Sequence, residues 1–382
     1  MTNAILLSAI LAACGILLWV LWRQQEEQAG KADEHVEDAR IPPLLRGINF
    51  LLSDEPDRAL KELVHVAKLQ TETAEVYLAL GDMFRNKGEF GRAVRIHQNL
   101  LARPDLPAHL HMQALFALAV DFQAGGLLGR ALQQYGRVLD KQPGHVQALE
   151  ASLRIREQGH EWAMAEELLE RLDRVRRTTS RLHHAYLLTE MARQKLGAQD
   201  EDAALDLVQK AVENDPACAA AHLLLAEINL KRDDVDSAIN SMRQLHAAAP
   251  FYLPLLIPIL LTHPEAYDSH GRDFLNQCWQ EEKDELLGVT WISSICKERG
   301  QDEALRTIHD IGFEPHSLHA CLHIKALLGD EEPLTLASRK WQQAQKNFSC
   351  IQCGVKFVDM RWQCPQCHQW GSIRPIREKD NT

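Results

Sequence analysis

The sequence predicts an all-α protein with an N-terminal membrane helix, a solenoid of helical hairpins and a small metal-binding module at the C-terminus. Three observations support this architecture: an uninterrupted apolar run at the start, a small residue that recurs at a helical-repeat spacing, and two C-x-x-C motifs near the end. The chain has 382 residues, of which 46% are hydrophobic, and a net charge of -11. Such a composition predicts a folded chain with a large core and excludes general disorder.

The first element is the apolar run from Ala4 to Trp22, which contains no charge and no proline. It is long enough to span a bilayer as a helix. Only Met1, Thr2 and Asn3 precede it, so the basic region of a cleaved signal peptide is missing and we expect the helix to be retained. Basic residues follow the run and none precedes it, which predicts that the rest of the chain faces the cytoplasm. These residues are Arg23, Lys31, Arg40 and Arg46.

An exported lipoprotein is the alternative, because Leu11-Ala-Ala-Cys14 resembles a lipobox. Cleavage before Cys14 would leave the apolar stretch 15–22 at the new N-terminus, so the membrane helix is the preferred interpretation. Cysteine usage agrees with a reducing compartment. Of nine cysteines, four have metal-site spacing, and the other five, at positions 14, 218, 278, 296 and 321, form no disulfide framework.

The middle of the chain is predicted to consist of helical hairpins with a small alanine where the second helix crosses the first. Successive alanines are separated by 34, 38, 34, 39 and 34 residues, and 34 is the period of tetratricopeptide repeats. An extra helical turn or a longer loop would account for each long step. The alanines are Ala59, Ala93, Ala131, Ala165, Ala204 and Ala238. Pro143, Pro216 and Pro250 each lie twelve residues after Ala131, Ala204 and Ala238, which supports this register.

A single hairpin cannot bury its apolar stripe, so neighbours stack into a superhelix whose concave face can receive a peptide or protein. A passive spacer is the alternative. Beyond Pro250 the register is lost, and the segment 251–261, with two internal prolines, predicts a kinked helical connector. The predicted parts are a membrane anchor (1–22), a linker (23–39), tetratricopeptide repeats (40–250), irregular or degenerate helical repeats (251–346), the metal module (347–376) and a tail (377–382).

The metal module is predicted from two C-x-x-C motifs separated by ten residues, which supply Cys350, Cys353, Cys364 and Cys367. Four thiolates with no open coordination position describe a closed structural site for one ion. Zinc and iron both accept tetrahedral sulfur, so the sequence leaves the choice between them open. Redox C-x-x-C motifs or two disulfides are the alternative. We expect the module to pack on the last helices of the chain, with Trp370 as a candidate contact residue.

The sequence gives little support for a catalytic function or for nucleic-acid binding. An acidic chain lacks the clustered positive charge that binds phosphate backbones. The glycines around Gly125 occupy a predicted turn between helices, His183 and His184 are interpreted as helix-surface residues, and the acidic cluster Asp233 to Asp236 is interpreted as turn and helix-start charges. We therefore expect a protein that is not an enzyme.

Several segments together resemble the lipopolysaccharide assembly protein B family. They are the apolar N-terminal run, Gly47-Ile-Asn-Phe-Leu-Leu-Ser53, Arg92-Ala-Val-Arg-Ile-His-Gln98, Trp362-Gln-Cys-Pro-Gln-Cys-His-Gln-Trp370 and Ile373-Arg-Pro-Ile376. The resemblance implies a cytoplasmic tetratricopeptide array and a rubredoxin-like module, attached to the inner membrane of a Gram-negative bacterium. It also implies that the four cysteines are the metal ligands.

The same resemblance implies an adaptor that promotes degradation of the lipid A deacetylase LpxC by the membrane AAA+ protease FtsH, and thereby restrains lipopolysaccharide synthesis. Other inner-membrane proteins of lipopolysaccharide assembly and sensing are implied as partners, and a homodimer stays open. The alternative function is a general envelope-assembly scaffold, in exported form a lipoprotein, that binds proteins through its repeats without a role in proteolysis. Confinement of receptor and protease to one membrane would raise the local concentration of captured substrate.

Overall fold

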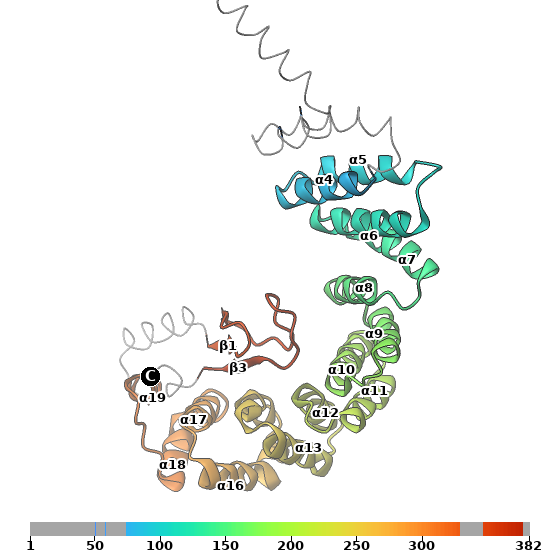
Figure 1. Cartoon of the computed structure of the whole chain (residues 1–382). Helices are drawn as coiled ribbons and strands as arrows, with labels where there is room; N and C mark the ends of the chain where they lie inside the picture. The colour runs from blue at the N-terminus through green and yellow to red at the C-terminus, as the bar shows by residue number, and fades with distance from the viewer. Residues whose placement is uncertain (1–49, 51–57, 59–73, 329–346, 377–382) are drawn as a thin grey trace, which may run out of the picture. The chain divides into compact units, whose positions relative to one another are not determined.

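The computed structural model describes residues 50, 58, 74–328 and 347–376 of the chain (Figure 1). Contacts divide it into two compact units, with the boundary between Pro143 and Gly144. Within the described residues no helix is both long enough and apolar enough to cross a membrane. The predicted anchor 1–22, the linker 23–39 and the crossing residue Ala59 lie outside the described residues, and the predicted domain limits stay predictions.

The first unit contains two helical hairpins, α4 (Ala74–Asn86) with α5 (Phe90–Leu101) and α6 (Ala108–Ala124) with α7 (Leu128–Lys141). Each helix packs on the next along the chain. Phe84, Ala93 and Leu100 are all buried in the core of the first hairpin, and Ala93 is one of the predicted crossing residues. Gly125 and Gly126 lie between α6 and α7, and Gly126 has a φ of 74°, so the turn predicted there is confirmed.

A buried polar network ties together three helices of this unit. His97 Nδ1 on α5 lies 2.5 Å from Asp121 Oδ2 on α6, and Arg85 on α4 donates from Nη1 to Asp121 Oδ1 at 2.8 Å. His97 and Asp121 are fully buried, and a buried carboxylate with two partners avoids the cost of an unpaired charge. The imidazole lies directly against Gly81, where an added Cβ would come within 2.3 Å of Nε2. Gly81 therefore makes room for the histidine.

The second unit begins with three hairpins. Their helices pack in chain order: α8 (Val146–Gln158), α9 (Trp162–Arg176), α10 (Arg181–Gly197), α11 (Glu201–Asn214), α12 (Ala219–Lys231) and α13 (Val235–Ala248). Asp200 and Asp234 cap α11 and α13 by accepting the backbone N–H three residues on, and Asp236 lies in the first turn of α13. The turn and helix-start interpretation of this acidic cluster is confirmed.

Helix length explains the uneven spacing of the small residues. Ala93, Ala131, Ala165, Ala204 and Ala238 are all fully buried, as the crossing positions require. First helices α4, α8 and α12 have 13 residues each, whereas α6 and α10 have 17. The difference of four residues is about one helical turn, and α6 and α10 are the helices within the 38- and 39-residue steps. Of the two explanations, the extra turn is the one observed.

Beyond α13 the register changes, as predicted. The connector is a 3-10 helix, η2 (Pro250–Leu255), followed by the short helices α14 (Ile257–Leu261) and α15 (Pro264–Ala266). A π-helical segment, η3 (Tyr267–Gly271), leads into α16 (Arg272–Glu282). A further hairpin, α17 (Glu285–Arg299) with α18 (Gln301–Ile311), precedes α19 (Leu318–Leu328). Trp291, Ile295 and Ala304 are fully buried there, in agreement with a degenerate repeat.

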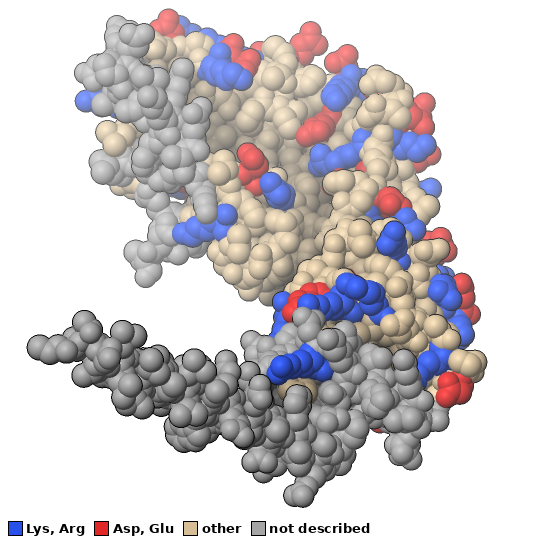
Figure 2. All heavy atoms as spheres, turned by 90° about the horizontal axis from the view of Figure 1, so that it is seen from above, with Lys and Arg blue, Asp and Glu red and all other residues tan. Residues whose placement is uncertain are grey.

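The described surface carries charges of both signs. On the face shown in Figure 2, Lys and Arg are interspersed with Asp and Glu over the coloured residues. The arginines at the end of α9 follow this rule, because Arg176 pairs with Glu150 and Arg174 with Glu170.

Gly81→Ala should destabilise the first unit. The new methyl group meets the buried His97 ring, and overpacking of this kind costs about 1–3 kcal/mol, more than the 0.5–1 kcal/mol that alanine gains over glycine in a helix. Gly136→Ala on α7 is the matched control, because an added Cβ there meets nothing within 4 Å. Urea unfolding should give a lower midpoint for the first variant and a higher one for the second. Equal midpoints would contradict the close approach.

Candidate metal centre and its contact with the repeats

The C-terminal module is built on a three-stranded antiparallel sheet of order β2-β1-β3. β1 (Phe348–Cys350) pairs with β2 (Lys356–Phe357) around the first cysteine motif and with β3 (Ile373–Pro375). The second strand of this hairpin ends at Phe357. The register places Cys350 opposite Ile373, and both are buried.

The two cysteine motifs fold into equivalent turns. The carbonyl oxygen of Cys350 accepts from Gly354 N at 2.8 Å, and that of Cys364 accepts from His368 N at 2.8 Å. In each turn the residue after the second cysteine is left-handed, with φ of 73° at Gly354 and 57° at His368. Glycine adopts this conformation freely, whereas a histidine there is strained and must be held by its surroundings. The two turns thus have the same backbone geometry, although glycine occupies the left-handed position in one and histidine in the other.

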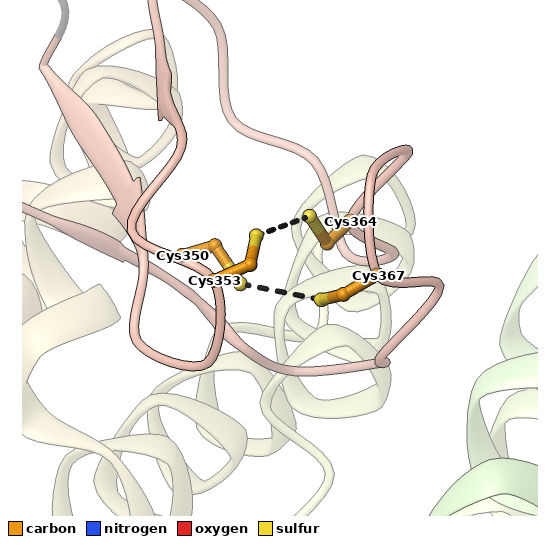
Figure 3. A group of neighbouring side chains, drawn as sticks. All are labelled: Cys350, Cys353, Cys364 and Cys367. Carbon is orange, nitrogen blue, oxygen red and sulfur yellow. Dashed lines mark hydrogen bonds between the residues drawn. The ribbon is translucent and has the colours of Figure 1, made fainter.

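These turns bring together the four cysteines predicted from the sequence (Figure 3). Their sulfur atoms all lie within 4.8 Å of one another, and the Sγ distances Cys350–Cys367 and Cys353–Cys364 are both 3.6 Å. Tetrahedral coordination with metal–sulfur bonds of about 2.3 Å requires sulfur–sulfur distances of about 3.8 Å. The arrangement therefore fits one structural ion, zinc or iron, and the alternative of two disulfides is not what the described residues form.

Electrostatics explains why this cluster favours a cation. Burial opposes ionisation of Cys350, but its hydrogen bonds with Ser372 and with backbone amides lower the pKa of its thiol to about 6. At Cys367 a backbone amide also favours the thiolate, but burial and the neighbouring sulfurs outweigh it and raise the pKa to about 12. Four thiolates so close together repel one another, and a divalent ion would offset that repulsion. When bound, the ion supplies structural coordination and leaves no open position for a substrate.

The second motif carries the contact with the repeats. Trp370, three residues beyond Cys367, stacks on Tyr186 of α10 with ring centroids 5.1 Å apart and an interplanar angle of 22°. Burial raises the pKa of Tyr186 well above its usual range, so the phenol is neutral. Gly371 lies against the same tyrosine, where an added Cβ would be 2.6 Å from the hydroxyl oxygen. The role of Trp370 as a contact residue is confirmed.

The polar part of this contact consists of hydrogen bonds to a buried carboxylate on α8. Trp370 Nε1 donates to Glu157 Oε1 at 3.2 Å, and Gln363 Nε2 donates to Glu157 Oε2 at 2.8 Å. His183 Nε2 on α10 lies 2.5 Å from the same Oε1. Only 4% of Glu157 is exposed, so these donors replace the water that the carboxylate loses. The carboxylate thus links two repeats to the module.

Trp362 provides a third anchor. Its ring contacts Tyr252 of η2 at 5.0 Å, and Tyr252 donates from its hydroxyl to the carbonyl oxygen of Ile373 at 2.8 Å. Arg374 lies over the ring of Phe251 at 4.6 Å. These contacts fall on α8, α10 and η2, so the expectation that the module packs on the last helices is wrong in its location. The aromatic residues that the module contacts are Tyr186 in the repeats and Phe251 and Tyr252 in the connector η2.

The inner side of the curved second unit is consequently occupied. Figure 1 shows the helices of this unit curving around β1 and β3. The first helices α8 and α10 contact Gln363 and Trp370 of the module, and they belong to the repeats whose concave face we expected to receive a peptide or protein. Between α8 and η2 the inner face is therefore an intramolecular interface.

The two adjacent histidines are half-buried on α10 and have carboxylate partners that the sequence did not predict. His183 lies beside Glu157. His184 Nδ1 lies 2.7 Å from Glu166 Oε1 and Nε2 lies 3.3 Å from Asp173 Oδ2. The hydrogen bond to Glu166 raises the pKa of His184 above its usual value despite partial burial. Both residues lie on a helix as interpreted, but each is paired with a carboxylate of an earlier helix.

The fold and the site together define a tetratricopeptide-repeat protein with a rubredoxin-type metal module. Family models agree: a rubredoxin metal binding domain matches residues 348–375, and tetratricopeptide repeats match residues 76–109 and 189–252. Among solved structures, a tetratricopeptide repeat protein from Parabacteroides merdae covers 69% of this chain and 98% of its own, with 18% identity and a TM-score of 0.34.

Curated relatives are similar over nearly the whole chain. Lipopolysaccharide assembly protein B of Escherichia coli K12 is 26% identical over 98% of both chains. The protein of the same name from Haemophilus influenzae is 25% identical over 94% of this chain and 96% of its own. The resemblance predicted from the sequence is confirmed by these relatives and by the match to the metal module.

Cys364→Ser should abolish metal binding and unfold the module, because removal of one thiolate leaves an incomplete site. Elemental analysis should find one zinc or iron ion per wild-type chain and none per variant chain. Cys321→Ser is the matched control, since Cys321 is exposed and distant in sequence from the motifs. Full metal content in the Cys364 variant would show that the sulfur cluster is not the binding site.

Glu157→Ala should detach the module from the repeats while the metal stays bound. It removes the acceptor of Trp370 Nε1 and leaves Gln363 Nε2 only a longer contact to the carbonyl oxygen of His368, at 3.4 Å. A donor left without a partner costs about 1–3 kcal/mol. Limited proteolysis should then cut around residue 347 faster than in wild type. Glu150→Ala is the control on the same helix, because its partner Arg176 is largely exposed and the pair should contribute less than about 1 kcal/mol. Equal cleavage rates in both variants would argue against the anchoring role.

Proposed function

We propose that this protein is a non-enzymatic adaptor in lipopolysaccharide assembly. The observation that carries the proposal is the similarity of nearly the whole chain, metal module included, to proteins named lipopolysaccharide assembly protein B. A repeat scaffold with a closed sulfur site favours a binding protein over a catalyst. Repeats of this type present large patterned surfaces to protein partners.

In the finer form of the proposal, residues 1–22 anchor the chain in the inner membrane and the repeats face the cytoplasm. The partners are the membrane protease FtsH and the deacetylase LpxC, whose degradation the adaptor promotes. The hydrophobic run and the basic residues after it support the anchoring and the orientation. Shared confinement to one membrane raises the effective concentration of the captured deacetylase at the protease.

The structure restricts where such partners can bind. Trp362 and Trp370 already cover the inner face of the repeats between α8 and η2. A partner segment that entered there would have to replace the hydrogen bonds to Glu157. We therefore place partner contacts on the outer face of the second unit or on the repeats of the first unit.

Deletion of residues 1–22 should leave a folded, metal-loaded protein that no longer promotes degradation of the deacetylase. The test uses a Gram-negative host without its own homologue, and it measures the deacetylase half-life by pulse-chase after expression of each form. Replacement of residues 1–22 with an unrelated membrane helix of the same orientation is the matched control and should restore turnover.

Two results would contradict the proposal in different ways. Undiminished turnover with the soluble form would reject the proximity mechanism. An unchanged half-life with the full chain, together with an envelope defect when it is absent, would favour the alternative of a general assembly scaffold. Protease accessibility of the repeats in spheroplasts would reveal an exported lipoprotein.

A further inference from the structure

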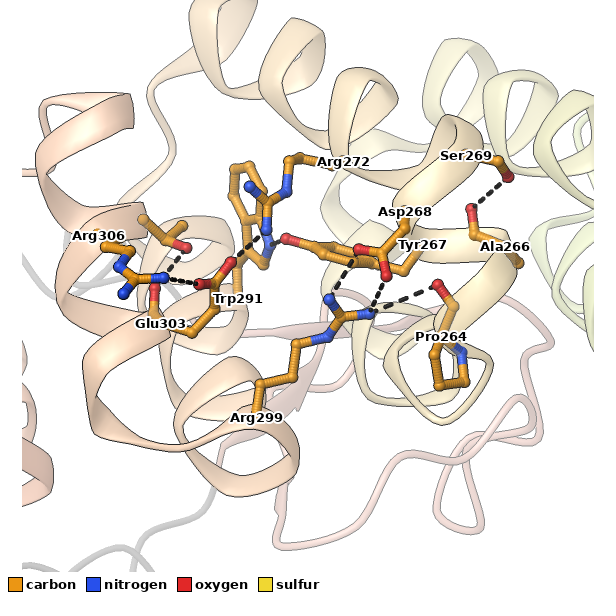
Figure 4. A network of polar contacts seen from close by, with 11 residues as sticks. Pro264, Ala266, Tyr267, Asp268, Ser269, Arg272, Trp291, Arg299, Glu303 and Arg306 are labelled. Carbon is orange, nitrogen blue, oxygen red and sulfur yellow. Dashed lines mark hydrogen bonds and ion pairs between the residues drawn. The ribbon is translucent and has the colours of Figure 1, made fainter.

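A charged hollow lies on the second unit, away from the sulfur cluster. Its volume is about 520 Å³, and it is lined by Asp268 of η3, Arg272 of α16, Arg299 of α17 and Glu303 of α18 (Figure 4). The π-helical segment Tyr267–Gly271 immediately precedes Arg272. Single π-helical turns within helices are uncommon and are found disproportionately at functional sites.

Both arginines are held in fixed positions by one buried ring. The guanidinium carbon of Arg299 lies 4.6 Å from the ring centroid of Tyr267, and that of Arg272 lies 5.5 Å from it. Tyr267 is fully buried, and its hydroxyl oxygen accepts from Trp291 Nε1 at 3.0 Å. A guanidinium fixed in this way loses little side-chain freedom when it binds an anion. The cations of the hollow are therefore preorganised.

Asp268 occupies the position on Arg299 that the oxygens of a phosphate or carboxylate ligand would take. Asp268 accepts from both terminal nitrogens of Arg299, at 2.7 and 3.1 Å, which is the forked geometry that a phosphate or carboxylate group also adopts. The Asp268 side chain is 56% exposed, whereas that of Arg299 is only 20% exposed. The aspartate can swing into solvent more easily than the arginine can leave the ring.

The carboxylate beside Arg272 is shared with a second arginine. Two arginines and two carboxylates line the hollow, so its lining is balanced in charge. Glu303 also pairs with Arg306, which lies beside the hollow at 3.4 Å and is 75% exposed. One carboxylate therefore offsets two guanidinium groups only in part, which favours an added anion at Arg272. The pair of Arg232 with Asp202 is an ordinary surface pair, since the Asp202 side chain is 95% exposed.

We infer that this hollow, the Arg272–Arg299 site, binds a phosphate group that takes the place of Asp268 on Arg299. The phosphate belongs either to a small soluble ester or to a lipid headgroup, and both present the same oxygens to the guanidinium fork. The inference is independent of the proposed adaptor function.

The test measures phosphate binding to the full chain in nonionic detergent, by calorimetry at low ionic strength. The probes are inorganic phosphate, glycerol phosphate and the short-chain lipid dihexanoyl phosphatidate. Arg299→Gln and Arg272→Gln should abolish binding. Asp268→Asn should tighten it by up to about fivefold, because the variant removes a competing charge worth at most about 1 kcal/mol. Arg232→Gln is the matched control and should change nothing.

The variant at Asp268 separates a binding site from a structural ion-pair network. If the network is structural only, Asp268→Asn lowers stability and produces no gain in binding, which would overturn the inference. Arg299→Lys retains the charge without the fork, so it keeps the fold and should still lose most of the affinity. Preference for dihexanoyl phosphatidate would assign the site to a headgroup, and preference for glycerol phosphate to a soluble ester. Binding of no probe by the wild-type chain would refute the site.

Discussion

The buried carboxylate of Glu157 accepts the hydrogen bonds that hold the second cysteine motif against the repeats. Its two oxygens face donors from α10 and from the module at once, so one side chain of α8 joins three segments that are far apart in the chain. The aromatic contact of Trp370 with Tyr186 supplies the apolar part of the same contact. A carboxylate is costly to bury, and it is tolerated only where its donors are fixed. The position of the whole module therefore depends on how rigidly Gln363 and Trp370 are held.

The repeats show how a fixed crossing residue can coexist with a variable period. Alanine at each crossing lets the second helix approach the first, and this constraint is local to a hairpin. The extra turn of α6 and of α10 lengthens only the first helix and leaves the crossing unchanged. In α10 the longer helix bears His183, His184 and Tyr186 on its first two turns. A departure from the 34-residue period thus accompanies a change in what the helix contacts.

The sequence predicted what depends on short-range spacing. Patterns within a few tens of residues predict the crossing alanines, the turn at Gly125, the helix start at Asp234 and the four cysteines. The sequence did not predict the surface on which the module packs, because Glu157 and Gln363 are 206 residues apart and no spacing pattern connects them. The partners of His184 were missed for the same reason, since the carboxylates that satisfy it lie on the preceding helix. The hollow at Arg272 and Arg299 depends on a ring that only the fold places beneath both side chains. The anchor 1–22 lies outside the described residues and stays a prediction.

Metal binding and packing of the module on the repeats are physically linked. Gln363 immediately precedes Cys364, and Trp370 follows Cys367 by three residues, so an ion that fixes these cysteines also fixes both donors to Glu157. Two events that favour the same arrangement stabilise each other by equal free energies. A docked module then raises the metal affinity, and a bound metal raises the occupancy of the inner face of the repeats. If the protein acts as the proposed adaptor, its partners meet a second unit whose inner face the metal-loaded module already covers.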